Sequence, residues 1–157
     1  MIGLLMVRNE SRIIERAIKS LGCCERVLVV DTGSTDNTVE IAEKWGCSIR
    51  HHAWKDFGHN RSLSFKEAVE LTPCCRSAEW VLAMDADMKF VCDVPRLQQF
   101  LDRSTDAGHT IVQKNGNLEY RNVRIMRLSE DWRCKGVTHE YWTCRHATVG
   151  EIPKEIA

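Results

Sequence analysis

The sequence predicts an α/β protein with a mostly parallel, doubly wound sheet. Short apolar runs alternate with segments whose apolar residues recur at helical spacing, and over residues 1–51 they follow a β-α-β-α-β order. The run at residues 80–84 is apolar throughout, which is typical of a buried central strand of a parallel sheet. After His109 the pattern changes, and an Asn-Gly pair between two short apolar runs indicates antiparallel strands late in the chain.

The first strand and the first helix occupy the start of the chain. Residues 1–7 are apolar and predict a strand. The helix that follows has its apolar residues on one face, which is the pattern of a helix packed against a core. We expect Asn9 or Ser11 to cap its start and Gly22 to end it.

The next three elements repeat this order. Residues 27–30 predict a buried second strand, and residues 48–51 predict a third. Between them a second helix begins near Asn37, which stands at capping-box spacing from Glu40, and it ends at Gly46. A right-handed, mostly parallel sheet follows from this alternation.

The remaining elements are predicted from the same signals. Residues 54–62 form a loop that leads into a helix, and this helix ends before Pro73. Asp93 and Pro95 begin another helix, which continues through Leu101. The late strands are predicted at residues 110–112, 118–120 and 123–128.

Length and charge limit the function classes that fit. The chain has 157 residues, 43% of them hydrophobic, so we expect a single domain over residues 1–157. Lysine plus arginine and aspartate plus glutamate both number 22, and no long basic stretch occurs. This excludes a general nucleic-acid or membrane surface and predicts that any phosphate binding is local. None of the eight cysteines is in a Cys-x-x-Cys pair, which argues against a zinc site.

No apolar run reaches the roughly 20 residues that a membrane helix needs. Residues 1–7 are also too short, and lack the leading basic cluster, for a signal peptide. We therefore expect a cytoplasmic protein without a transmembrane segment, unless the chain is a domain cut from a longer protein.

Residues 31–38 form the first motif with chemical content. An acid at a strand end, a tight glycine turn and a helix start can offer a carboxylate and backbone N–H groups to a nucleotide. The simpler alternative is a turn that only caps the helix. The catalytic aspartate of an aspartic protease also lies in an Asp-Thr-Gly-Ser sequence. That site needs β-structure on both sides, whereas here a helix pattern follows at once.

Asp85 and Asp87 form the second motif. Two carboxylates at a strand end can together face a divalent cation and the phosphates that it carries. Solvated acids that cap the next turn are one alternative. Another is a haloacid-dehalogenase-like phosphatase, which uses the first acid as nucleophile, but that site opens its domain and is followed by threonine or valine rather than Met88.

The third motif contains His139 and Glu140. A neutral imidazole is a common ligand of divalent metals, and the adjacent glutamate can bind or deprotonate a hydroxyl. A lone His-Glu is more often a surface pair. The pair therefore indicates a functional site only in combination with the other two motifs.

Together these motifs resemble the family 2 glycosyltransferases, which have the nucleotide-sugar-binding GT-A fold. The resemblance rests on five motifs that occur in the expected order over nearly the whole chain. They are Asn9-Glu10-Ser11, Asp31 to Thr38, Trp54 with Asp56-Phe57 and Asn60-Arg61, Asp85-Ala86-Asp87, and Gly136 with His139-Glu140.

The resemblance implies an inverting glycosyltransferase that moves a sugar from a nucleotide sugar, in particular a UDP-sugar, to an acceptor hydroxyl with Mn²⁺ or Mg²⁺. The acceptor is an unspecified glycan, lipid or protein, and a non-catalytic nucleotide-sugar-binding module is the alternative. Met88-Lys89 stands where many relatives have an acid after Asp-x-Asp. The short tail after Glu140 fits either a minimal catalytic domain or a piece of a longer chain.

The resemblance also implies roles for individual residues. The implied nucleotide-binding residues are Arg8, Asn9, Glu10, Asp31, Asn60, Arg61, Asp85 and Ala86. The implied metal ligands are Asp87, His139 and Asp85. Glu140 is the candidate base for the acceptor hydroxyl, with Glu130 and Asp131 as alternatives.

Overall fold

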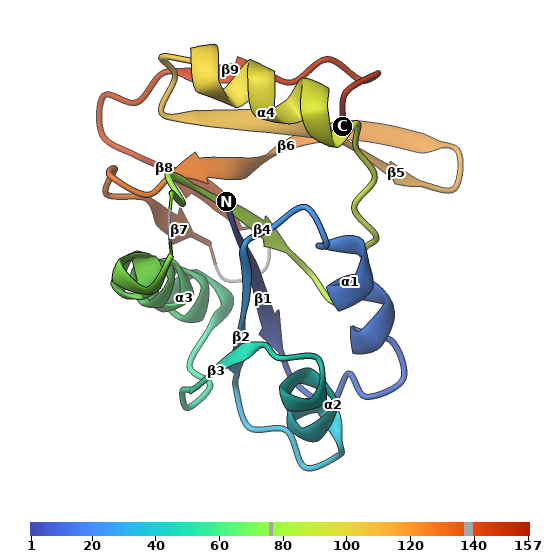
Figure 1. Ribbon diagram of the computed structural model, residues 1–157. Helices are drawn as coiled ribbons and strands as arrows, with labels where there is room; N and C mark the ends of the chain where they lie inside the picture. The colour runs from blue at the N-terminus through green and yellow to red at the C-terminus, as the bar shows by residue number, and fades with distance from the viewer. Residues whose placement is uncertain (76, 137–139) are drawn as a thin grey trace.

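The computed structural model describes residues 1–75, 77–136 and 140–157. Within these residues a seven-stranded sheet has helices on both faces, and a two-stranded sheet lies beside it (Figure 1). The strands of the main sheet are β1 (Ile2–Val7), β2 (Arg26–Asp31), β3 (Ser48–His51), β4 (Trp80–Met84), β5 (Gly108–Asn115), β6 (Leu118–Arg127) and β9 (Val149–Glu151). The small sheet consists of β7 (Arg133–Lys135) and β8 (Tyr141–Thr143). The helices are α1 (Ile14–Ser20), α2 (Thr38–Lys44), α3 (Phe57–Leu71), the 3₁₀ turn η1 (Thr72–Cys74) and α4 (Val94–Arg103).

The described strands of the main sheet stand in the order β3-β2-β1-β4-β6-β5-β9. The first four are parallel, β6 is antiparallel to both β4 and β5, and β9 is parallel to β5. This confirms the predicted α/β class, with its mostly parallel sheet and late antiparallel strands. Because β1 lies between β2 and β4, the carboxyl ends of three parallel strands meet at one edge of the sheet.

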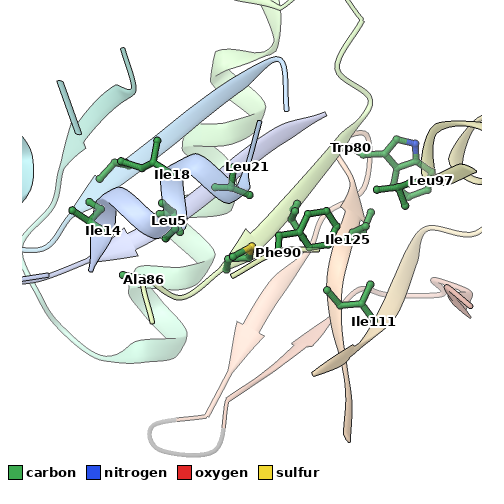
Figure 2. Close-up of a cluster of buried hydrophobic side chains, with 14 of the residues drawn as sticks. Leu5, Ile14, Ile18, Leu21, Trp80, Ala86, Phe90, Leu97, Ile111 and Ile125 are labelled. Carbon is green, nitrogen blue, oxygen red and sulfur yellow. The ribbon is translucent and has the colours of Figure 1, made fainter. Parts of the chain in front are cut away.

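Alternate residues of the parallel strands point to opposite faces and build two separate cores. On one face, Leu5 and Ile125 of the sheet share a core with Ile14 of α1 and Leu97 of α4 (Figure 2). Helix α2 adds Ala42 to the same core. These three helices therefore cover one face of the sheet.

Helix α3 covers the opposite face alone among the described helices. Its residues Phe65 and Ala68 are buried in a core with Leu4, Leu28 and Val81 of β1, β2 and β4. Burial of such side chains stabilises the fold by about 1.5–3 kcal/mol each before entropy is counted. This packing fixes α3, which also carries a residue of the candidate site.

Two helices begin differently from the prediction. The N-cap of α1 is Ile13, so the expected cap at Asn9 or Ser11 is wrong. Asn37 is the N-cap of α2 but makes no side-chain capping bond, so the expected capping box with Glu40 is wrong as well. The Asn9 side chain instead accepts from the backbone N–H of Thr35, and the Glu40 side chain accepts from Lys44 within α2.

The late strands are longer than predicted. Residues 118–120 and 123–128 were expected as separate strands, but β6 runs from Leu118 to Arg127 because its pairing with β5 continues through polar Arg121 and Asn122. The short strands β7, β8 and β9 were not predicted, since three residues carry little periodic signal. No helix in the described ranges is both long and apolar enough to cross a membrane.

Candidate functional site

A cavity of about 460 Å³ opens where β1, β2 and β4 end. Parallel neighbouring strands bring the residues that follow them together, although these residues are far apart in the sequence. Six of the predicted site residues line this cavity, namely Arg8, Glu10, Arg61, Asp85, Ala86 and Asp87. Its size and its convergent polar groups make it the candidate ligand site.

The segment after β1 and the loop after β2 hold each other through hydrogen bonds. Asn9 has a positive φ of 56°, and its Oδ1 accepts from the backbone N–H of Thr35 at 2.7 Å. The backbone N–H of Asn9 donates to Oγ of Ser34 at 2.9 Å, and that of Glu10 donates to Oγ1 of Thr38 at 2.7 Å. Two sequence motifs thus form one wall beside the cavity, and Asn9 supports this wall.

Asp31 ends β2 and is buried. Its carboxylate accepts from the backbone N–H groups of Gly33 and Ser34, both at 3.1 Å, and Nδ1 of His51 lies 3.4 Å away. Burial raises the pKa of Asp31, but the bonds from Ser34, Gly33 and His51 outweigh it and leave the pKa below its ordinary value. Asp31 is therefore ionised near neutral pH and orders the turn beside Thr32, which lines the cavity.

Both carboxylate oxygens of Asp85 are bonded to arginines. Arg61 Nη2 donates to Oδ1 at 2.5 Å, and Arg124 Nη2 donates to Oδ2 at 3.1 Å. Burial raises the pKa of Asp85, but the two guanidinium charges outweigh it and lower the pKa. The chain turns after β4 ends at Met84, and both Asp85 and Asp87 line the cavity. Both oxygens of Asp85 are used within the protein, and a cation shared by the two carboxylates stays a prediction.

Asp87 is exposed and lines the cavity. Its backbone oxygen accepts from Nη2 of Arg16 at 2.6 Å, which ties the turn to α1. Glu10 lines the same cavity, and burial together with the negative charges of Asp87, Asp36 and Asp85 raises the pKa of Glu10. Negative charge thus gathers at this edge, and Asp87 and Glu10 offer the oxygen ligands that suit Mg²⁺ or Mn²⁺.

The metal-binding prediction is only partly within the described residues. His139 lies outside them, and the described part of the chain holds no group of three or more His, Cys, Asp or Glu side chains that could bind a metal ion. Mg²⁺ commonly takes only one or two protein carboxylates and completes its shell with phosphate oxygens and water. The cavity residues therefore fit a divalent cation that is shared with a phosphate-bearing ligand.

Arg61 also bonds to Glu140, the candidate base. Its Nε donates to Oε1 of Glu140 at 3.2 Å, and its Nη2 lies 3.1 Å from the same oxygen. The Arg61 side chain is only 9% exposed. A buried guanidinium therefore joins Asp85 to Glu140 and holds the candidate base next to the cavity.

The start of α3 reaches Glu140 because it docks closely on β7. Oγ of Ser62 accepts from the backbone N–H of Cys134 at 2.9 Å. Gly58 permits the approach, since an added Cβ there would lie 2.9 Å from the carbonyl oxygen of Gly136. This contact places the helix that carries Arg61 beside β7 and Gly136.

The two alternative bases are placed differently. Asp131 is exposed and pairs with Arg133 at 3.0 Å. Oε2 of Glu130 lies 4.0 Å from Sγ of Cys144. Neither acid bonds to a cavity residue within the described part of the chain, so the geometry favours Glu140.

Asn60 supports the cavity wall. It is buried, and its side-chain amide donates to the carbonyl oxygen of Ala53 at 3.0 Å and accepts from the backbone N–H of Lys55 at 2.8 Å. The placement differs from the predicted contact with a nucleotide, because both ends of the amide are used within the protein. Asn60 instead holds the loop that carries Trp54.

Trp54 and Phe57 were not among the predicted ligand contacts, yet both line the cavity. Their ring centroids are 4.8 Å apart, and the two residues are 39% and 38% exposed. Exposed aromatic faces beside a polar cavity suit a base or sugar ring. Arg124 was not predicted either; it is one of two arginines in the predicted strand at residues 123–128, and nothing in the sequence separates it from Arg127.

Comparison with known families gives one match that covers most of the chain. The sequence model of the family described as "Glycosyl transferase family 2" matches residues 4–149. Curated relatives match as well. An uncharacterized glycosyltransferase of Rickettsia conorii is 39% identical over 86 residues, which covers 54% of this chain and 28% of that protein.

A TPR repeat-containing protein of Synechococcus elongatus is 26% identical over 142 residues, which covers 87% of this chain and 34% of that protein. The chain therefore spans about a third or less of the length of these two relatives.

Solved structures share the fold. S. aureus TarS 1–349 in complex with UDP has a TM-score of 0.55 and 21% identity, over 74% of this chain and 36% of that chain. Glucosyl-3-phosphoglycerate synthase of Mycobacterium tuberculosis in complex with Mn²⁺, UDP and glucosyl-3-phosphoglycerate has a TM-score of 0.54 and 21% identity, over 73% of this chain and 44% of that chain. These likenesses confirm the predicted GT-A fold.

Proposed function

The chain belongs to glycosyl transferase family 2, and from this premise we propose that it moves a sugar from a UDP-sugar to an acceptor hydroxyl. We further propose inversion at the anomeric carbon and dependence on Mn²⁺ or Mg²⁺. The observation that carries the proposal is the cavity at the ends of β1, β2 and β4. There Asp87 and Glu10 offer cation ligands, and Arg61 holds the candidate base Glu140 close by.

We assign the donor to this cavity. Trp54 and Phe57 are placed to contact the uracil or the sugar, and base–aromatic stacking contributes about 1–3 kcal/mol per base. Arg8 offers a positive charge to the diphosphate. Asp87 and Glu10, together with His139, are the proposed metal-binding residues, and the bound cation would offset the charge that develops on the leaving UDP.

Glu140 is the proposed general base. In the transfer, the acceptor oxygen bonds to the anomeric carbon, the bond from that carbon to the diphosphate breaks, and its electron pair leaves with UDP. The acceptor proton passes to Glu140. The hydrogen bond from Arg61 goes to Oε1 and leaves Oε2 to accept this proton. Arg61 is thus a positioning residue, held in turn by Asp85.

A non-catalytic nucleotide-sugar-binding module is the second candidate. It is favoured by one observation, namely that Asp85 and Glu140 both have ion-pair partners inside the protein and can serve stability alone. A haloacid-dehalogenase-like phosphatase has no such support, because its nucleophile would be Asp85, whose two oxygens are both bonded to arginines.

Calorimetry with UDP tests the donor site. We expect binding in Mn²⁺, loss of binding in EDTA and a steep loss for Asp87→Ala, because Asp87 is the exposed carboxylate that lines the cavity. Asp102→Ala, an exposed acid on α4, is the control and should bind UDP like the wild type. Equal UDP affinity in Mn²⁺ and in EDTA would contradict the proposed metal dependence.

Turnover separates the enzyme from the binding module. UDP release is measured for a panel of UDP-sugars with Mn²⁺, with and without hydroxyl acceptors. Release of UDP that depends on Mn²⁺ and Glu140 supports transfer. Binding of UDP-sugars without hydrolysis or transfer would support the binding module instead.

A further inference from the structure

The segment that connects β4 to α4, residues 85–93, passes beside α1 (Figure 1). Two hydrogen bonds hold it there. Nη2 of Arg16 donates to the carbonyl oxygen of Asp87 at 2.6 Å, and the backbone N–H of Phe90 donates to Oγ of Ser20 at 3.0 Å. Arg16 and Ser20 stand at i and i+4, so they lie on one face of α1. The helix and the connecting segment therefore run side by side in the same direction.

Three cysteines continue this contact just beyond the end of α1. Cys23 and Cys24 follow the helix, and Cys92 follows Phe90 in the connecting segment. The thiols of Cys24 and Cys92 both donate hydrogen bonds to Sγ of Cys23. All three side chains pack against the core that α1 covers, and Cys23 and Cys92 are half-buried. Cys23 and Cys92 are thus the third pair of residues in contact along the two segments.

The three thiols differ in how readily they ionise. The hydrogen bond from Cys24 is the largest influence on Cys23, and together with the bond from Cys92 it outweighs burial and lowers the pKa of Cys23. The bond to Cys23, and then burial, raise the pKa of Cys24. Burial and the charge of Cys23 raise the pKa of Cys92. Cys23 therefore has the largest thiolate fraction of the three, and the thiolate is the nucleophilic form.

We propose that Cys23 and Cys92 are a redox-sensitive pair, which a hydroperoxide converts to a disulfide that tethers the connecting segment to the end of α1. The Cys23 thiolate attacks one oxygen of hydrogen peroxide, the O–O bond breaks, hydroxide leaves, and Cys23 becomes a sulfenic acid. The sulfur of Cys92 then attacks the sulfur of Cys23. The S–S bond forms, the S–O bond breaks, and the hydroxyl group leaves with the Cys92 proton as water. The pair loses two electrons, which reduce the peroxide to water.

Cys92 rather than Cys24 is the partner of Cys23 in this bridge. A disulfide between the adjacent residues Cys23 and Cys24 would close a small ring through a planar peptide unit, which is strained. Sγ of Cys24 also lies against β1, at 3.3 Å from the position of a Cβ added to Gly3. Cys92 stands in a segment without helix or strand, which can shift to meet the geometry of a disulfide. The same segment carries Asp87, so the redox state of the pair sets how firmly a residue of the donor cavity is held.

Peptide mapping of the full chain tests the bridge. The reduced protein is treated with hydrogen peroxide, the remaining thiols are blocked with iodoacetamide, and the protein is digested with trypsin without reductant. We expect mass spectrometry to find the peptides 20–26 and 90–96 joined, and to find them separate after reduction. Cys23→Ser and Cys92→Ser should each abolish the joined product. Cys24→Ser and Cys74→Ser, the second of which changes an exposed thiol, should keep it.

Hydrogen exchange of the Phe90 amide, measured by NMR, tests the tether. This N–H is bonded to Oγ of Ser20, so it exchanges when the connecting segment opens away from α1. We expect exchange to slow by about tenfold or more in the bridged protein, and to return to its starting rate after reduction. Cys92→Ser treated with peroxide in the same way should show no change.

Three results would overturn the inference. The first is that peroxide leaves peptides 20–26 and 90–96 separate in the folded wild-type protein. The second is a joined product that persists in Cys23→Ser, which would assign the bridge to Cys24. The third is a bridged protein in which Phe90 exchanges at its starting rate. None of these measurements uses UDP or a sugar donor, so failure of this inference and failure of the proposed function are distinguishable.

Discussion

Arg61 and Glu140 stand 79 residues apart in the chain, and in the folded protein Nη2 of Arg61 lies 3.1 Å from Oε1 of Glu140. The same guanidinium bonds to Asp85, so one buried cation serves two carboxylates. Removing one partner of such a buried pair typically costs about 3–5 kcal/mol, because the remaining charge is left without a partner. This ion pair therefore links the candidate base to the stability of the donor cavity.

Arg61→Lys should separate positioning from binding. Lysine keeps the charge but cannot bond to Asp85 and Glu140 with the same fork of donors. We expect kcat for transfer to fall by about 10–100-fold, which is the scale of a misplaced catalytic group, with a smaller change in KM for the UDP-sugar. Arg133→Lys, in an exposed pair with Asp131, is the control. An unchanged kcat for Arg61→Lys would exclude a positioning role.

Glu140→Gln should remove the proposed base and keep its shape. We expect UDP affinity to stay near that of the wild type while the transfer rate falls by about 100-fold or more. Glu130→Gln and Asp131→Asn should transfer at wild-type rates, because neither acid bonds to a described cavity residue. If Glu130→Gln or Asp131→Asn lost activity while Glu140→Gln remained active, the base would be assigned to the segment before β7. His139→Ala, in contrast, should weaken metal-dependent UDP binding.

Asp31→Ala should weaken recognition of the nucleoside. Asp31 orders the turn beside Thr32 through Gly33 and Ser34, and loss of such a buried bond costs on the order of 1–3 kcal/mol. Calorimetry should show reduced affinity for UDP and little change for pyrophosphate with Mn²⁺. An equal loss for both ligands would assign Asp31 to the metal site or to folding.

Stability should depend on the ionisation of Asp85 in acid. Its pKa in the folded protein is below the ordinary value of about 3.9, so its contribution is fully present above that value and is lost as the pH falls through the folded pKa. Urea denaturation of the wild type should therefore show a decreasing free energy of unfolding below about pH 4. Asp85→Asn should be less stable at pH 7, with a smaller decrease in acid. Parallel pH curves for the two proteins would contradict this.

The sequence predicted most of the fold because its signals are local and periodic. The alternation of apolar runs with segments of helical periodicity predicted β1 to β4 and the four α-helices. The Asn115-Gly116 pair predicted the β5–β6 hairpin. The cap of α1 was wrong because Asn9 bonds to a loop 26 residues away in the chain. Strands of three residues, such as β7 and β8, have no period long enough to detect.

Sequence alone determined which polar residues follow the parallel strands, and therefore that Glu10 and Asp87 meet at one edge of the sheet. Only the tertiary structure decided how the charges pair. Asp85 and Asp87 look equivalent in the sequence and both line the cavity, yet the oxygens of Asp85 are bonded to Arg61 and Arg124, whereas Asp87 is exposed. The physical reason is that strand ends follow from local pattern, whereas this ion pair needs side chains from α3, from the turn after β4 and from β6 within hydrogen-bonding distance. Only packing of the helix against the sheet provides that.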